Sequence, residues 1–362
     1  FVFALIAWSL ASSFFPTFFP DLTTQTYWTM GITASLLLFA SVLLHELSHS
    51  LVAKAKHIKV ESITLFFFGG VAGITKEDMK PSSEFLMAIA GPIFSLFLAG
   101  IFFLIYQFNG NIFWTAITYY LWQLNLILAI FNMIPGFPLD GGRAFRAVLH
   151  WYYKDLKKAT RIAVAGGKFF AAFLFFLGVF GLISGTGAGL WFIFLGGFLY
   201  FIAGASYEQV IVRETLSNIP LKDLMDKKFV TLKPEMSFVD FVKKFENTGQ
   251  DVFVVQDKKF AGILNLNKIQ KMPVKMQQLV KLKQVALPFH QVKSLKKDDT
   301  VYVAFRKFAE QGLELLPVLD NGKLIGIVTR QKIMHRLVWE LKFNGSRKLG
   351  KRVEKAIKKS VK

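Results

Sequence analysis

Long apolar runs dominate the first 212 residues of the chain. A helix that crosses a bilayer needs about 20 mostly apolar residues, because each residue adds only about 1.5 Å along the helix axis. Six stretches reach or approach that length. We therefore predict six membrane-spanning helices, over residues 1–19, 28–53, 84–107, 112–134, 160–183 and 187–211.

A different pattern separates the second and third of these spans. Residues 60–73 read VESITLFFFGGVAG, a run of β-branched and aromatic residues that ends in glycines. This composition is typical of a strand or hairpin rather than a helix. Non-helical backbone is tolerated at membrane depth only where protein or a water-filled cavity covers it. We therefore predict a re-entrant β-element here, within a membrane domain that spans residues 1–212.

After residue 212 the apolar runs become short and an internal repeat begins. Residues 231–269 align with residues 294–333, at an offset of 63 that becomes 64 after one insertion in the turn at residues 320–322. Each copy has the pattern of an amphipathic helix, a strand, a hairpin, a second strand and a helix. This pattern predicts an α/β domain over residues 213–342, with repeats at about 217–272 and 280–338. A basic tail, residues 343–362, follows it.

Composition and charge sharpen this division. The 362 residues are 53% hydrophobic, which excludes a disordered chain and an ordinary soluble protein. The formal net charge is nevertheless +20, and 32 of the 44 Lys and Arg residues follow residue 212. No aromatic residues interleave with the basic tail, so we expect an anionic lipid surface rather than nucleic acid as its partner. The absence of cysteine excludes disulfides and thiolate metal sites. Since the chain begins at Phe1 rather than Met, we expect native residues before it.

The remaining 12 basic residues indicate an orientation. All of them lie between or beside spans two and three, or spans four and five, and the opposite connections contain none. Basic residues concentrate on the cytoplasmic side of membrane proteins. An even number of spans then places both termini on that side. We therefore predict a multi-pass protein of the cell membrane with a cytoplasmic C-terminal domain.

Three ionisable side chains interrupt the second span, and they carry the candidate chemistry. His45, Glu46 and His49 follow an apolar run, although each ionisable group at such depth costs about 2.5–3.5 kcal/mol. His45 and His49 are four residues apart and share one helix face, so both imidazoles can reach one Zn²⁺. Glu46 lies beside them, where a general base for the attacking water belongs. The alternative is a pair of histidines that bond to neighbouring carbonyls.

A hydrolytic zinc takes three protein ligands, so the pattern requires a third. Asp140 is the best placed, because Pro135 and Pro138 end the preceding helix and Gly141 and Gly142 allow a tight turn back into the bundle. As an alternative, Asp140 caps a helix or belongs to a turn. The other candidates in this half of the chain are His57, His150 and Glu208.

The two motifs together identify a family resemblance. HELSH at residues 45–49, paired with NMIPGFPLDGG at residues 132–142, resembles the site-2 protease family of intramembrane zinc metalloproteases. The whole chain is similar to the six-span prokaryotic type with a C-terminal pair of CBS repeats. The resemblance implies that His45, His49 and Asp140 bind one zinc ion and that Glu46 is the catalytic base. It also implies that Asn132 helps to hold the substrate or the oxyanion; alternatively, Asn132 bonds to carbonyls that Pro135 leaves free.

The resemblance further implies the substrate and the reaction. Such an enzyme hydrolyses peptide bonds within or near the transmembrane helix of single-span proteins in the bilayer, which is regulated intramembrane proteolysis. The segment AGPIFS at residues 90–95 resembles a third-span motif of the family, with Ser95 where Asn is common. Ser48 likewise stands where Gly is common. For Gly91 and Ser95 we expect a role in helix packing rather than in catalysis.

The CBS repeats depart from the family's nucleotide-binding pattern, in which an acidic residue follows Ser or Thr by three positions. The equivalent pairs here are Thr329 with Lys332 and Asn265 with Lys268. The loss of the acid argues against ordinary binding of an adenine nucleotide, although a lysine could meet a phosphate. It favours a role as a scaffold, a gate or the interface of a homodimer.

Two other functional classes compete with proteolysis in the membrane. One is a non-catalytic, CBS-regulated membrane transporter or pseudoprotease with a structural metal. Glu46 argues against it, because a structural zinc needs no base. The other is a membrane metallopeptidase for soluble substrates, which would not need the edge of a re-entrant β-element.

Overall fold

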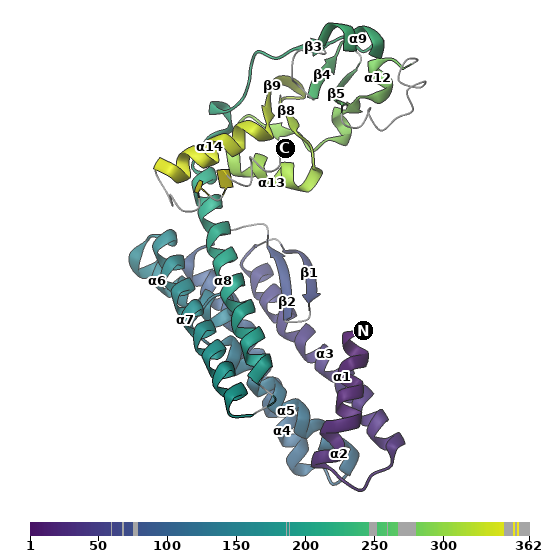
Figure 1. Cartoon of the computed structure of the whole chain (residues 1–362), viewed down its shortest axis with the longest axis vertical. Helices are drawn as coiled ribbons and strands as arrows, with labels where there is room; N and C mark the ends of the chain where they lie inside the picture. Colours follow the sequence, from purple (N-terminus) through teal and green to yellow (C-terminus); the bar gives the residue numbers. More distant parts are fainter. Residues whose placement is uncertain are drawn as a thin grey trace. The chain divides into compact units, whose positions relative to one another are not determined.

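The chain folds into two compact units, Phe1–Tyr207 and Glu208–Lys362 (Figure 1). The computed structural model describes residues 1–58, 79–185, 187, 189–245, 252–258, 260–266, 280–343, 350–351 and 353–354, and the backbone of residues 60–66 and 69–74. Lys268 and most of the basic tail lie outside these residues. Helix α8 (Gly189–Ser217) enters both units, and the domain boundary at residue 212 stays a prediction.

The described part of the chain has five helices that are long and apolar enough to cross a membrane. They are α3 (Thr24–Ala55), α4 (Pro81–Phe108), α5 (Ile112–Asn132), α7 (Leu156–Ile183) and α8. Their outward faces carry large exposed apolar side chains, among them Phe97 on α4 and Phe169 and Phe176 on α7. Such surfaces are stable in lipid rather than in water. The predicted fold class, a helical membrane body followed by an α/β region, is therefore confirmed.

The first predicted span has a different form, and the count of six spans is not confirmed. It consists of α1 (Val2–Ser9), a π-helical turn at Leu10–Phe14 and α2 (Phe15–Phe18), and it is shorter than the helices that qualify as spans. Pro16 has no amide hydrogen to give to the preceding turn, which accounts for the interrupted helix. Phe15 packs instead into a buried cluster with Met30 of α3 and Leu121 of α5.

The predicted β-element is present as a hairpin. Strands β1 (Val60–Phe66) and β2 (Gly69–Ile74) are antiparallel, with Val60 opposite Ile74 and Phe66 opposite Gly69. The hairpin lies beside the C-terminal part of α3 (Figure 1). Its predicted re-entry into the bilayer is not confirmed.

A further helix, α6 (Asp140–Tyr153), was not predicted from the sequence. The connection before it crosses α7 with backbone against backbone: the amide of Phe137 donates to the carbonyl of Ala163 at 3.2 Å. A Cβ added to Gly136 would lie only 2.5 Å from the Cα of Gly167. Glycine is needed at such a crossing because any side chain would separate the two backbones. The crossing fixes the position at which α6 begins, and therefore the position of its first residue, Asp140.

The second unit contains the same strand arrangement twice, which confirms the tandem repeat. In one sheet β3 (Thr231–Leu232) is parallel to β4 (Val252–Gln256), and β5 (Ala261–Asn265) is antiparallel to β4. In the other, β7 (Leu295–Lys296) is parallel to β8 (Leu315–Asp320), and β9 (Lys323–Thr329) is antiparallel to β8. Within the residues of this unit that the structure describes, the strands are accompanied by helices α9 (Phe238–Phe245), α12 (Leu282–Val285), α13 (Val301–Gln311) and α14 (Arg330–Phe343).

The two repeats exchange segments from near their N-terminal ends. Asp226, near the start of the first repeat, pairs with Ile327 of β9 in the second. Strand β6 (Leu287–Pro288), near the start of the second repeat, pairs with β5 in the first. Each sheet is therefore completed by a segment from the other half, and the repeats form one body.

Candidate metal centre

Helix α3 positions the two histidines of the HELSH motif. His45 and His49 are both buried, at 3% and 5% exposure. Because they are one helical turn apart, their rings project from the same face. Their Nε2 atoms lie 3.2 Å apart. Two buried nitrogen atoms this close together form a pair that one cation can bridge.

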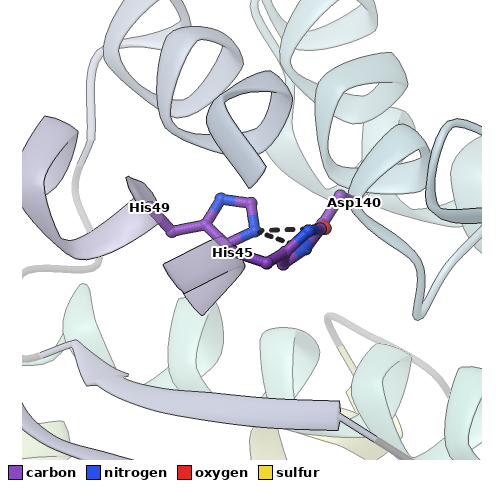
Figure 2. A group of neighbouring side chains, drawn as sticks. All are labelled: His45, His49 and Asp140. Carbon is purple, nitrogen blue, oxygen red and sulfur yellow. Dashed lines mark hydrogen bonds and ion pairs between the residues drawn. The ribbon is translucent and has the colours of Figure 1, made fainter. Parts of the chain in front are cut away.

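Asp140 completes a cluster of three from a separate part of the chain. It is the first residue of α6, and its Oδ2 lies 3.3 Å from His45 Nε2 and 3.2 Å from His49 Nε2 (Figure 2). In a tetrahedral zinc site with bonds of about 2.0–2.1 Å, neighbouring ligand atoms are about 3.3 Å apart. The three atoms therefore match one face of a zinc tetrahedron. Among the described residues, His57, His150 and Glu208 do not belong to this cluster.

Helix α4 provides a hydrogen-bond partner for the Nδ1 atom of each imidazole ring. His49 Nδ1 lies 2.6 Å from the carbonyl oxygen of Met87, and His45 Nδ1 lies 2.8 Å from the hydroxyl of Ser95. Since a carbonyl only accepts, His49 Nδ1 is the donor in this contact, and Nε2 is the nitrogen of the ring that can bind a metal. Such outer partners fix the ring orientation of metal-binding histidines. From the sequence we expected a packing role for Ser95, and neither hydrogen bond was predicted.

Gly91 of α4 leaves the space beside the cluster free of side chains. A Cβ added to Gly91 would lie 2.5 Å from His45 Nε2, and it would also overlap His49 Nε2. Glycine is therefore required at this position, because any side chain would occupy the volume between the imidazoles and the helix.

Gly91→Ala is expected to lower zinc affinity by at least about tenfold, because the new methyl group must displace one imidazole from its position. Zinc affinity of the purified chain, measured by competition with a chelator, checks this. Gly100→Ala on the same helix is the matched control, since a Cβ there meets nothing within 4 Å. Equal zinc affinity in both variants would contradict the steric account.

Ser95→Ala is expected to lower zinc affinity by about 10- to 100-fold, because the ring of His45 loses its outer hydrogen bond. Metal competition again provides the measurement. Ser35→Ala is the control: Ser35 is also fully buried in this bundle, and its hydroxyl bonds to no partner in the described structure. If Ser95→Ala binds zinc like the control, Ser95 serves packing alone.

The two other candidate site residues lie on α3 and α5. Glu46 follows His45 directly on α3 and is partly buried. Asn132 is the last residue of α5, and its Nδ2 donates to the carbonyl of Leu128 at 3.0 Å. This bond to a helix carbonyl resembles the alternative role expected for Asn132, in which its side chain bonds to backbone carbonyls.

In the second unit, an ion pair occupies the position where the CBS family has an acid. The Nζ of Lys332 lies 2.5 Å from Asp226 Oδ1, and Thr329 Oγ1 accepts a weak hydrogen bond of 3.4 Å from the Lys332 amide. The charge of Lys332 is therefore matched within the chain. The equivalent Lys268 lies outside the described residues.

Comparisons with known proteins agree with this two-part organisation. The family model of peptidase family M50 matches residues 33–112 and 108–177, and that of the CBS domain matches residues 221–273 and 283–338. A zinc metalloprotease of Methanocaldococcus jannaschii is 36% identical over 313 residues, covering 85% of this chain and 86% of its own length.

Solved structures resemble each half. The site-2 protease from Methanocaldococcus jannaschii is 33% identical, covering 57% of this chain and 88% of its own length, with a TM-score of 0.40. The CBS domain of the bacterial CNNM/CorC family Mg²⁺ transporter, in complex with ATP, is 12% identical, covering 37% of this chain and 97% of its own length, with a TM-score of 0.32.

Proposed function

Because this chain belongs to peptidase family M50, the site-2 proteases, we propose that it hydrolyses peptide bonds within or near the transmembrane helix of single-span membrane proteins. The chain is a membrane zinc metalloendopeptidase with tandem CBS domains. The observation that carries the finer proposal is the position of the cluster: His45 and His49 lie within a helix that is apolar enough to cross the bilayer.

We assign the three clustered side chains as the zinc ligands. His45 and His49 offer neutral imidazole nitrogens and Asp140 a carboxylate oxygen, a donor set that suits Zn²⁺. Bound zinc would polarise the scissile carbonyl and lower the pKa of a water molecule toward about 7. Three protein ligands are the number found in hydrolytic zinc sites rather than in structural ones.

We assign proton transfer to Glu46. Its carboxylate takes the proton of the attacking water and then gives it to the amine of the leaving peptide. Asn132 is our candidate for holding the substrate carbonyl. An amide has two N–H donors, so the bond to Leu128 leaves a second N–H for the substrate.

A helical substrate must unwind locally before hydrolysis, because its peptide groups are engaged in hydrogen bonds within the helix. We propose that the unwound segment pairs with the hairpin of β1 and β2. Within the described residues, this two-stranded sheet has an unpaired edge on each strand, and it lies beside the helix that carries His45 and His49. Pairing with such an edge would hold the segment extended.

We also propose the orientation and the role of the second unit. The 12 basic residues of the membrane part support a cytoplasmic position for the CBS domains, because such residues concentrate on the cytoplasmic side of membrane proteins. The ion pair of Lys332 with Asp226 supports a role for the CBS pair as a scaffold, gate or homodimer interface rather than as an adenine-nucleotide site.

The test of this function uses the full chain, purified in detergent with zinc bound, and several model single-span substrates. We expect fragments whose masses place the cleaved bond in or near the transmembrane segment. A chelator should stop the reaction, and added zinc should restore it. If the zinc-bound protein cuts none of the substrates, a non-catalytic role is favoured. Cleavage confined to soluble peptides would instead indicate a membrane peptidase of a different specificity.

A further inference from the structure

A buried ion pair joins α4 to α6 near the metal cluster. The Nε of Arg146 donates to Glu84 Oε1 at 2.8 Å, and Arg146 Nη2 contacts the same oxygen. The side chains of Glu84 and Arg146 are only 3% and 12% exposed. Burying two charges is costly even when they pair, and apolar residues of similar volume often stabilise a fold as well. A role in fixing geometry is therefore the better explanation for the pair.

Glu84 lies on the same face of α4 as the residues that hold the histidines. Residues at positions i, i+3, i+7 and i+11 fall along one side of a helix. Glu84, Met87, Gly91 and Ser95 have this spacing, and all four are buried. Met87 holds the ring of His49 and Ser95 that of His45, so this face of α4 sets the positions of both imidazoles.

Arg146 lies on the element that carries the third side chain of the cluster. It follows Asp140 by six residues on α6, about 9 Å along the helix axis. Its guanidinium carbon also lies 4.8 Å from the ring centroid of Phe137, in the connection just before Asp140. Arg146 therefore contacts both α4 and the segment that leads into Asp140.

We propose that Glu84 and Arg146 are positioning residues for the metal centre. Their ion pair fixes α6 to the face of α4 that orients His45 and His49, and so sets the position of Asp140 Oδ2 relative to the two Nε2 atoms. The inference rests on the proposed function only in taking these three side chains as zinc ligands. Without the pair, α6 can shift along α4 and the three ligand atoms no longer converge.

The test compares Glu84→Gln and Arg146→Gln with the wild type, using the full chain in detergent. Zinc affinity is measured by chelator competition, and the site geometry by the visible absorption spectrum of the Co²⁺-loaded protein. We expect zinc to bind 10- to 100-fold more weakly, the range typical for loss of an outer partner, and the Co²⁺ spectrum to change. Arg146→Lys should recover most of the affinity, because it keeps the charge. Arg330→Lys in an exposed ion pair of the second unit is the control.

A double variant provides the test if the proteins with single substitutions do not fold. Glu84→Gln combined with Arg146→Met removes both charges and leaves neither one buried and unpaired. It should fold, yet bind zinc as weakly as the single variants. Zinc affinity and a Co²⁺ spectrum like those of the wild type, in the single variants or in the double, would overturn the proposal.

A failure of the positioning role can be distinguished from a failure of the proposed function. A wild type that binds zinc tightly and cuts no substrate would remove the proteolytic function, but not the positioning role. A wild type that cuts its substrate, together with a Glu84→Gln variant of unchanged zinc affinity, would remove the positioning role alone.

Discussion

Glu46→Gln is expected to abolish peptide hydrolysis while zinc stays bound. Glutamine has nearly the same shape as glutamate, but it cannot accept the proton of the attacking water at neutral pH. General acid–base catalysis contributes about 10²- to 10⁴-fold to a rate, and Glu46 acts both as base and as acid in the proposed reaction. We therefore expect kcat to fall by at least about 1,000-fold. The rate of cleavage of a single-span substrate, together with the zinc content of the same preparation, provides the measurement.

The control for this variant is Glu235→Gln. Glu235 is an exposed carboxylate in the second unit that pairs with Lys281 and Lys283, so its loss should leave both cleavage and zinc content unchanged. Cleavage by Glu46→Gln within tenfold of the wild-type rate would show that another group takes the proton. Loss of zinc from Glu46→Gln would place this residue among the ligands instead.

Asp140→Asn is expected to remove zinc and, as a consequence, activity. The amide that replaces the carboxylate is neutral and a much weaker ligand for a hard or borderline cation. Since loss of a mere outer partner costs about 10- to 100-fold in affinity, loss of a direct ligand should cost at least about 100-fold. Chelator competition measures the affinity, and the cleavage assay follows the activity across added zinc concentrations.

Asp155→Asn is the matched control for Asp140→Asn. Asp155 caps the next helix, α7, where its Oδ1 accepts a 3.0 Å hydrogen bond from the Lys158 amide. Asparagine caps helices as well as aspartate does, so this variant should keep zinc affinity, stability and cleavage. If Asp140→Asn also keeps its zinc, the third ligand is another residue, and His57, His150 and Glu208 become the residues to test.

The central part of the site could be predicted from the sequence because local spacing determines it. Two histidines four residues apart on a helix must share a face, so His45 and His49 needed no tertiary information. Asp140 required more: the sequence showed that a helix ends before it, and the family resemblance made it the third ligand. The structure brings its Oδ2 to within 3.3 Å of both imidazoles.

The partners of these residues could not be predicted in the same way. Met87 holds His49 through a backbone carbonyl, which every residue possesses and no sequence pattern marks. Arg146 was interpreted only as one of the basic residues that orient the protein in the membrane. Its ion pair with Glu84 spans 62 positions of the chain and depends on how α4 and α6 pack.

The helices, too, could be predicted only in part from the sequence. The length of the apolar runs predicted the five long helices of the described chain, since a membrane span mainly requires about 20 apolar residues in a row. It did not predict α6, which is short and amphipathic and begins with two glycines after Asp140. Nor could apolar length alone show that the first segment breaks at a π-helical turn before Pro16.

The most direct test of the central claim is the mapping of the cleaved bond in a bilayer. The full chain is reconstituted in lipid vesicles with a model single-span substrate, and the product masses are compared between the wild type and Glu46→Gln, both loaded with zinc. The account predicts fragments that end within or near the transmembrane segment for the wild type and none for the variant. The same fragments in equal amounts from both proteins would contradict it.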